Sequence, residues 1–333
     1  MTSNNRQKFN TLLLAVVILL TNLSGCSVSQ SEKISESAFV LNTVATITIY
    51  GSTDETLLDD AFALCRKYDA LLSRTDKNSE IYKLNTREIS TVSDETAALI
   101  AEGLYYGTLS GGAFDITIEP LAVLWNFTGD DPVVPTAADV AAAREKVDYS
   151  AVSISGNTVQ FANDSVRLDL GGIAKGYIAD RVKEYLVSKG VTSAIINLGG
   201  NVLCIGGKTD TKSFKIGIQY PFKEGSIASV TVSGLSVVTS GIYERYFEEN
   251  GKLYHHLLDP KTGYPADNGL LSVTIIGANS SVCDALSTAC FVLGVEKGSA
   301  LVEEFDGYYA IYLTDDYTFR FSAGAQDALD IDY

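Results

Sequence analysis

Alternation of apolar and polar residues marks several strand-length stretches of the chain. Residues 39–51, FVLNTVATITIYG, alternate in this way and close on Gly51, the period-two pattern of a half-buried β-strand. Further strands are expected in the following ranges: 147–161, 193–207, 214–221, 226–241, 252–259, 270–278, 307–316 and 317–323. Many of these ranges are neighbours joined by short turns, which is typical of hairpins.

Apolar positions three to four residues apart predict the helices. Residues 54–72 carry an acidic first turn and an apolar stripe, and residues 93–107 repeat this scheme with Ser93 or Asp94 as the cap. Similar spacing predicts helices at 173–189, 280–293 and 297–304.

Strands outnumber helices, and they lie in hairpin-like neighbours more than in regular strand-helix-strand alternation. This order predicts an α+β fold with mixed sheets instead of a doubly wound parallel sheet. No internal repeat, Pro-rich linker or break in composition divides residues 38–333, so we expect these residues to form a single domain.

The first 25 residues have the pattern of an export signal. Arg6 and Lys8 precede an apolar run from Leu12 to Leu20, which is too short to span a bilayer. The following residues 23–26, Leu-Ser-Gly-Cys, resemble the lipobox of bacterial lipoproteins, in which the Cys becomes the lipidated N-terminus. The alternative is an ordinary secretory signal with Cys26 near the cleavage site by chance.

With a lipid anchor, residues 1–25 are a lipoprotein signal peptide, and residues 26–37 are the lipidated Cys26 and a polar, Ser-rich tether. The protein is then exported and anchored to the outer face of the cell membrane, or lies in the periplasm if the host has an outer membrane.

Charge and cysteine usage exclude several classes of function. The chain has 25 Lys and Arg against 41 Asp and Glu, a net charge of -16, which argues against nucleic acid as a partner. Two His and five Cys without a Cys-x-x-Cys pair cannot form a zinc ribbon, an iron–sulfur cluster or a paired-Cys redox site, so a bound metal needs oxygen ligands. Cysteines in apolar patterns are expected to be buried thiols, with disulfides as the alternative that an exported context permits: Cys65, Cys204, Cys283 and Cys290.

The densest group of small residues, residues 168–182, contains a strand-to-helix turn. Gly171 and Gly172 end the strand, and Ala174, Lys175 and Gly176 open the helix, so free amide groups and an ammonium lie where a phosphate can bind. A tight turn with a solvated Lys175 explains the same residues, and the sequence is neither a Rossmann nor a Walker motif.

A second candidate site lies on the expected helix at 280–293. Asp284 and Thr288 are four residues apart and share one face, where a carboxylate and a hydroxyl suit a hard cation such as Mg2+. Asp284 could equally complement the helix dipole while Thr288 bonds back to a carbonyl.

The two histidines are adjacent, at His255 and His256. Neighbouring strand residues face opposite sides, so one imidazole is expected to point inward and the other to solvent. The inward one is the candidate general base, although a lone inward His is also common as a structural residue.

Seven segments in order resemble the ApbE family of FAD:protein FMN transferases. They are residues 79–81 (SEI), 111–127, 168–180 (LDLGGIAKGYIAD), 197–202 (NLGGNV), 237–247 (VVTSGIYERYF), 255–265 (HHLLDPKTGYP) and 283–294 (CDALSTACFVLG). The resemblance implies a T-fold-like α+β domain with mixed, mainly antiparallel sheets and packed helices.

The same resemblance implies a chemistry. The domain would bind FAD, hold Mg2+ at its pyrophosphate and transfer FMN to a Thr or Ser hydroxyl of an exported redox protein, releasing AMP. Acceptors of this family carry a pattern like Asp-(Gly/Ser)-x-x-(Ser/Thr)-Ala-Thr. The alternatives are an FAD pyrophosphatase that forms FMN and AMP, and a non-catalytic flavin-binding lipoprotein.

Carried over by position, His256 is implied as the base that takes the proton of the acceptor hydroxyl. Asp284, Thr288 and the carbonyl of Ala174 are implied as Mg2+ ligands. The implied dinucleotide contacts are Lys175, Gly176, Asp180, Ser240, Gly241 and Tyr243. The chain departs from the family at residues 41–43, Leu-Asn-Thr where Met-Gly-Thr is frequent, and Thr75 lies in a variable loop that we expect on the adenine side.

Overall fold

The computed structural model describes residues 32–208 and 210–333. The expected signal peptide, Cys26 and the first part of the expected tether lie outside these residues. Residues Lys33–Tyr333 form one compact unit.

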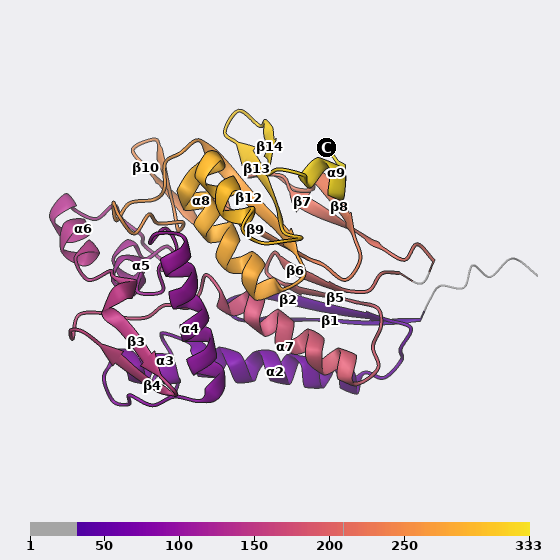
Figure 1. Ribbon diagram of the computed structural model, residues 1–333, viewed down its shortest axis with the longest axis horizontal. Helices are drawn as coiled ribbons and strands as arrows, with labels where there is room; N and C mark the ends of the chain where they lie inside the picture. The colour runs from indigo at the N-terminus through magenta and orange to yellow at the C-terminus, as the bar shows by residue number, and fades with distance from the viewer. Residues whose placement is uncertain (1–31, 209) are drawn as a thin grey trace, which may run out of the picture. The chain divides into compact units, whose positions relative to one another are not determined.

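An eight-stranded sheet is the centre of this unit (Figure 1). Its strands pair antiparallel throughout, as the hairpin-rich sequence predicts, so the expected α+β class with mainly antiparallel sheets is confirmed. From edge to edge the strands are β1 (Lys33–Val40), β2 (Thr43–Tyr50), β5 (Ala194–Leu198), β6 (Asn201–Ile205), β9 (Ser236–Gly241), β12 (Leu270–Gly277), β13 (Tyr309–Thr314) and β14 (Phe319–Phe321).

Long helices cover one face of this sheet (Figure 1). They are α2 (Thr56–Leu72), α7 (Ala174–Ser188) and α8 (Ser280–Val302), with α4 (Asp94–Leu109) packed against α8. The shorter helices are α3 (Glu80–Asn85), α5 (Glu119–Trp125), α6 (Ala137–Arg144), the 3-10 turn Tyr149–Ala151 and α9 (Ala325–Ala328).

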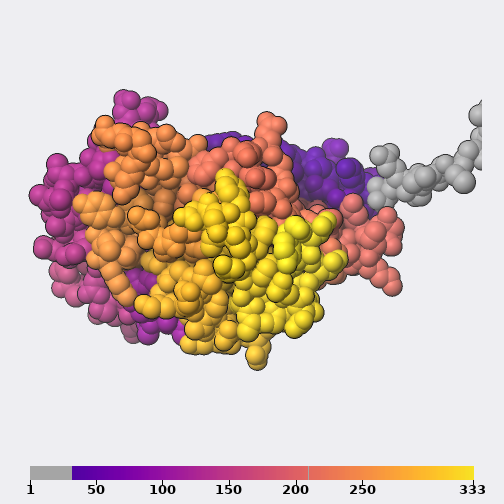
Figure 2. Space-filling model, turned by 90° about the horizontal axis from the view of Figure 1, so that it is seen from above, coloured from indigo at the N-terminus to yellow at the C-terminus, as the bar shows by residue number. Residues whose placement is uncertain are grey.

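Smaller sheets complete the unit. The order β15-β8-β7 joins Asp330–Asp332 to Ser226–Val232 and Phe214–Gln219, and its apolar side chains pack against the opposite face of the large sheet. In Figure 2 the C-terminal segment, in yellow, lies on the surface beside this sheet. Two hairpins remain, β3 (Val152–Ser155) with β4 (Thr158–Phe161), and β10 (Tyr246–Glu249) with β11 (Lys252–His255).

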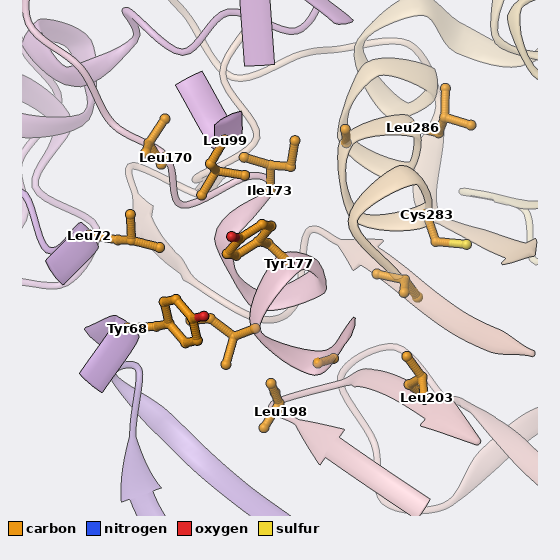
Figure 3. Close-up of a cluster of buried hydrophobic side chains, with 14 of the residues drawn as sticks. Tyr68, Leu72, Leu99, Leu170, Ile173, Tyr177, Leu198, Leu203, Cys283 and Leu286 are labelled. Atoms are coloured by element: carbon orange, nitrogen blue, oxygen red, sulfur yellow. The ribbon is translucent and has the colours of Figure 1, made fainter. Parts of the chain in front are cut away.

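The main core lies between the long helices and the sheet, where apolar stripes of period 3.6 meet strands buried on that face. Tyr68 of α2 meets Tyr177 of α7 edge to face, with ring centroids 5.6 Å apart, and Leu198, Leu203 and Leu286 belong to the same buried cluster (Figure 3). α7 also packs against α8, and these two helices carry most of the predicted site.

The N-terminal pattern resolves into a hairpin. Residues 39–51 were expected to be one strand, but Leu41 and Asn42 have φ of 57° and 56°, and this left-handed pair turns the chain between β1 and β2. β1 already begins at Lys33, so residues 33–37 of the expected tether pair with β2, where Ser35 and Ser37 exchange hydrogen bonds with Thr48 and Thr46.

Other elements differ from the sequence prediction as well. The expected strand ranges 147–161, 193–207 and 226–241 each contain two strands joined by a turn, and the short helices α3, α5, α6 and α9 were not expected. The two expected helices at 280–293 and 297–304 are the single element α8, which kinks at Gly294 with φ of 78°. Among the described residues α8 alone is long and apolar enough to cross a membrane, and 56% of its most apolar window is buried inside the protein, as in a core helix. The cysteines of residues 32–208 and 210–333 are free, buried thiols, as expected.

Candidate functional site

A cavity of about 1,090 Å³ gathers most of the residues that the sequence singled out. Its walls come from the tip of the β1–β2 hairpin, the glycine turn before α7, the start of the β9–β10 connection and α8. The predicted site residues that line it are Ala174, Lys175, Ser240, Tyr243, His256, Asp284 and Thr288. Segments more than a hundred residues apart in sequence therefore meet in one polar space.

The glycine turn brings the start of α7 against α8. At Gly172 an added Cβ would lie 3.0 Å from the ring of Phe114 and 3.6 Å from Thr288 Oγ1, so this glycine allows the turn to approach the predicted cation ligand. At Gly176 an added Cβ would lie 2.2 Å from the carbonyl oxygen of Ser280. Gly176 itself does not line the cavity, and it acts through this close helix contact.

Asp284 is the buried carboxylate of the cavity, with an exposed fraction of 3%. The backbone N–H of Gly176 donates to its Oδ2 at 2.9 Å, and the Lys175 ammonium lies 3.7 Å from its Oδ1. Burial raises the pKa of the Asp284 carboxyl, and the Lys175 charge opposes this shift. The Asp284 carboxylate thus lies between two donors of the first turn of α7, the Gly176 N–H and the Lys175 ammonium.

Thr288 lies one turn further along α8, and its hydroxyl is 3.5 Å from Ser240 Oγ on β9. Ser240 is in turn 2.8 Å from Ser287 Oγ. No cluster of three His, Cys, Asp or Glu that could hold a metal occurs within residues 32–208 and 210–333. A cation here therefore depends on Asp284, hydroxyl and carbonyl oxygens and its ligand's phosphates, a donor set that suits Mg2+.

Asp180 and Gly241 have structural contacts outside the cavity. The Asp180 carboxylate accepts hydrogen bonds from the backbone N–H groups of Ser280 and Ser281, each at 2.9 Å, and so caps the start of α8. At Gly241 an added Cβ would lie 2.6 Å from the Tyr243 ring. Neither residue lines the cavity. The dinucleotide contacts that the family resemblance implies for them stay predictions.

The two histidines occupy opposite environments, as their adjacency predicts, but the inward imidazole is not the one that the family resemblance implies as the base. His255 is the inward imidazole, only 6% exposed, with Nε2 3.2 Å from the carbonyl of Ala266 and its ring edge-on to Phe291. His256 is half-buried and lines the cavity. The two positions differ because His256 lines the cavity and His255 does not, a difference that the alternation of a strand cannot reveal.

The His256 imidazole has one ring nitrogen in a hydrogen bond and the other free. Its Nδ1 lies 3.3 Å from the carbonyl oxygen of Arg245, so the Nδ1–H tautomer donates there and leaves Nε2 with a free lone pair. Desolvation, followed by the charge of Arg245, lowers the pKa of His256 to about 3. The imidazole is therefore neutral at pH 7.

Several cavity residues were missed by the sequence reasoning. Arg74 and Asp169 form an ion pair of 2.9 Å in the wall, beside Thr75, which lines the cavity as well. Glu244 and Arg245 also line it, and both fall in residues 237–247, where the sequence reasoning selected only Ser240, Gly241 and Tyr243. Their charges, next to the selected Tyr243, were the sequence feature that could have identified them as site residues.

Fold and site together define a class: an α+β protein whose main cavity combines a buried carboxylate, an ammonium and a neutral imidazole, groups suited to a cation and a phosphate-bearing ligand. The sequence profile of the ApbE family matches residues 41–313. This chain belongs to the ApbE family.

Individual relatives agree with this membership. The chain is 34% identical to an FAD:protein FMN transferase of Treponema pallidum over 94% of this chain and 93% of that one. It is 40% identical to one of Klebsiella pneumoniae over 86% and 90% of the two chains. Its fold resembles an ApbE protein of Thermotoga maritima, with a TM-score of 0.81, 32% identity and coverage of 89% and 98%. The flavin transferase ApbE of Vibrio cholerae gives a TM-score of 0.79 at 26% identity, covering 89% and 99%.

Proposed function

We propose that this protein transfers the FMN part of FAD to a Thr or Ser hydroxyl of another protein and releases AMP. Relatives named FAD:protein FMN transferase, 32–40% identical over most of the chain, support this activity. The observation that carries it in this chain is the placement of the His256 imidazole in one cavity with Lys175 and Asp284.

The reaction is a single displacement at phosphorus. The acceptor oxygen forms a bond to the FMN phosphorus while the bond from that phosphorus to the oxygen of AMP breaks. The hydroxyl proton passes to Nε2 of His256, which the Nδ1 contact with Arg245 keeps free. Lys175 binds the charged pyrophosphate.

Mg2+ is part of this proposal. Asp284, Thr288 and the backbone at Ala174 would hold it, and the ion would neutralise pyrophosphate charge and improve AMP as a leaving group. A carboxylate at 3% exposure is costly without positive charge beside it. The Lys175 ammonium, 3.7 Å away, compensates this cost only in part, which supports a cation at Asp284.

The acceptor and the location are proposed with it. The acceptor is an exported redox protein with the pattern Asp-(Gly/Ser)-x-x-(Ser/Thr)-Ala-Thr. The protein itself is a lipoprotein held at the outer face of the membrane through Cys26, after removal of the signal peptide at residues 1–25. The lipobox-like residues 23–26 support this location.

The test is an intact-mass measurement of the acceptor. The fragment from Ser27 onward is incubated with FAD, Mg2+ and a small protein that carries the acceptor pattern. We expect a mass gain equal to FMN less water, absent without metal and absent when the acceptor Thr is replaced by Val. An unmodified acceptor with free FMN and AMP would identify a pyrophosphatase instead, and intact bound FAD would identify a flavin-binding lipoprotein.

A further inference from the structure

Asn201 has no role in the site described so far, although it follows the Leu-Gly-Gly turn that forms part of the cavity wall. It is the first residue of β6 and is only 1% exposed. Gly199 and Gly200 line the cavity, but Asn201 does not. Any effect of its side chain on a ligand must therefore pass through another residue.

A chain of hydroxyl groups holds one end of the Asn201 amide. Its Oδ1 accepts a hydrogen bond of 2.6 Å from Ser280 Oγ, and Ser280 Oγ lies 2.8 Å from Ser236 Oγ on β9. Because Oδ1 is committed to a donor, the amide cannot exchange its oxygen and nitrogen without losing this contact. The Nδ2 donor therefore has a fixed direction.

The same face of α8 continues to the candidate cation site. Ser280, Asp284 and Thr288 are spaced by four residues, so their side chains follow one another along one side of the helix. Asn201 Nδ2 is buried without a hydrogen-bond partner, and Ser280, which holds the other end of this amide, lies one helical turn from Asp284 on the same side of α8. A buried donor left unpaired is costly, and the adjacent carboxylate is the acceptor that can use it.

We propose that Asn201 is a positioning residue of the cation site: when a divalent cation shared with Thr288 binds, the unpaired Nδ2–H of Asn201 donates to the Asp284 carboxylate and orients it toward the ion. The inference rests on the cation site of the proposed function. With the Gly176 N–H on Oδ2, the carboxylate is then held by two fixed donors, and its remaining lone pairs are directed into the cavity. Partners of this kind typically alter metal affinity 10- to 100-fold.

The test measures Mn2+ binding to the full-length protein by electron paramagnetic resonance of the free ion, so it does not depend on turnover. Asn201→Leu keeps the branched shape of the side chain and removes the donor, and we expect the Kd for Mn2+ to rise at least about tenfold. The matched control is Asn197→Leu, because Asn197 Oδ1 accepts from Gly200 N in the same turn but Asn197 has no contact with Asp284. We expect its Kd for Mn2+ to stay within about twofold of wild type.

Each other outcome has a definite meaning. A purely structural Asn201 would lower the melting temperature of Asn201→Leu and leave its Kd for Mn2+ unchanged, which would overturn the inference alone. Absence of Mn2+ binding in the wild-type protein would overturn the proposed cation site and the inference together. If Asn201→Leu does not fold, Ser280→Ala decides, since it frees the amide; an unchanged Kd for Mn2+ in that variant rejects the positioning role.

Discussion

The adjacent imidazoles of His255 and His256 show how one residue of displacement along a chain separates a packed interior position from a position in the cavity wall. His255 packs against Phe291 in the interior, and His256 faces the cavity with Nε2 free. Two identical side chains thus have different surroundings because neighbouring residues point to opposite sides of the backbone.

For His256→Ala we expect FAD binding to persist and FMN transfer to fall by about 10²- to 10⁴-fold, the usual effect of removing a general base. The measurement is the initial rate of acceptor labelling together with the Kd for FAD. His255→Gln is the control, and its rate should stay within the same order of magnitude as wild type. An equal loss in both variants would show that the cavity does not distinguish the two positions.

The burial of His255 also predicts a pH-dependent stability. Burial lowers its folded pKa from 6.5 to about 4, with the Ala266 carbonyl and Asp267 opposing the shift. As the pH falls below 6.5 the unfolded chain therefore binds the proton first, so the stability contributed by neutral His255 is present above pH 6.5 and is lost progressively toward pH 4.

Between pH 7 and pH 5 we expect the wild-type free energy of unfolding to fall by about 2 kcal/mol more than that of His255→Gln. Urea unfolding at both pH values measures this difference. Parallel pH profiles of the two proteins would mean that His255 titrates normally in the folded state.

At the scale of elements, the contact between α7 and α8 builds the site. α8 presents Ser280, Asp284 and Thr288 on one side, and α7 supplies the Gly176 N–H to Asp284 and the Asp180 carboxylate to the first amides of α8. Asp180 thus fixes the first turn of α8, and because a helix is rigid, the later turns that carry Asp284 and Thr288 are fixed as well.

Asp180→Asn tests this connection. The amide keeps the size of the side chain but only one acceptor oxygen, so we expect the free energy of unfolding to fall by about 1–2 kcal/mol, as for a lost helix cap. FAD affinity, measured by titration, should change by less than about threefold, because Asp180 does not line the cavity. Asp59→Asn, an exposed first-turn carboxylate of α2, is the control and should leave stability nearly unchanged. A selective loss of FAD affinity would instead support the direct dinucleotide contact that the family resemblance implies.

At the scale of the whole molecule, the edge strand β1 limits how far the domain can stand from a membrane. β1 begins at Lys33, so only residues 27–32 separate it from Cys26. Six extended residues span at most about 20 Å. In the proposed lipoprotein the start of β1 is therefore at most about 20 Å from Cys26, and the cavity lies at the other end of this strand, at the tip of the β1–β2 hairpin.

The proposed anchor predicts that Cys26→Ser abolishes incorporation of an alkyne-labelled fatty acid in producing cells and moves the protein out of the membrane fraction. In-gel fluorescence after click labelling and fractionation measure both effects. Cys65→Ser, which changes a thiol buried in α2, should keep the label. Persistent labelling of Cys26→Ser would reject the lipidation site.

Local order in the sequence determined much of this protein. The four-residue spacing of Asp284 and Thr288 was sufficient to put both on one side of a helix, because helix geometry sets that relation whatever surrounds it. The start of α4 after Ser93 and the antiparallel strands were predictable for the same reason, since caps and alternation depend on near neighbours.

Only the tertiary structure decided which side chains share the cavity. It placed His256 rather than His255 there, paired Arg74 with Asp169, used Asp180 as the cap of α8 and set Asn201 against the α8 face that carries Asp284. These relations join residues distant in sequence, and they follow from the close packing of the helices on the sheet. Periodicity along the chain assigns a side chain to a face, but only packing determines what lies opposite that face.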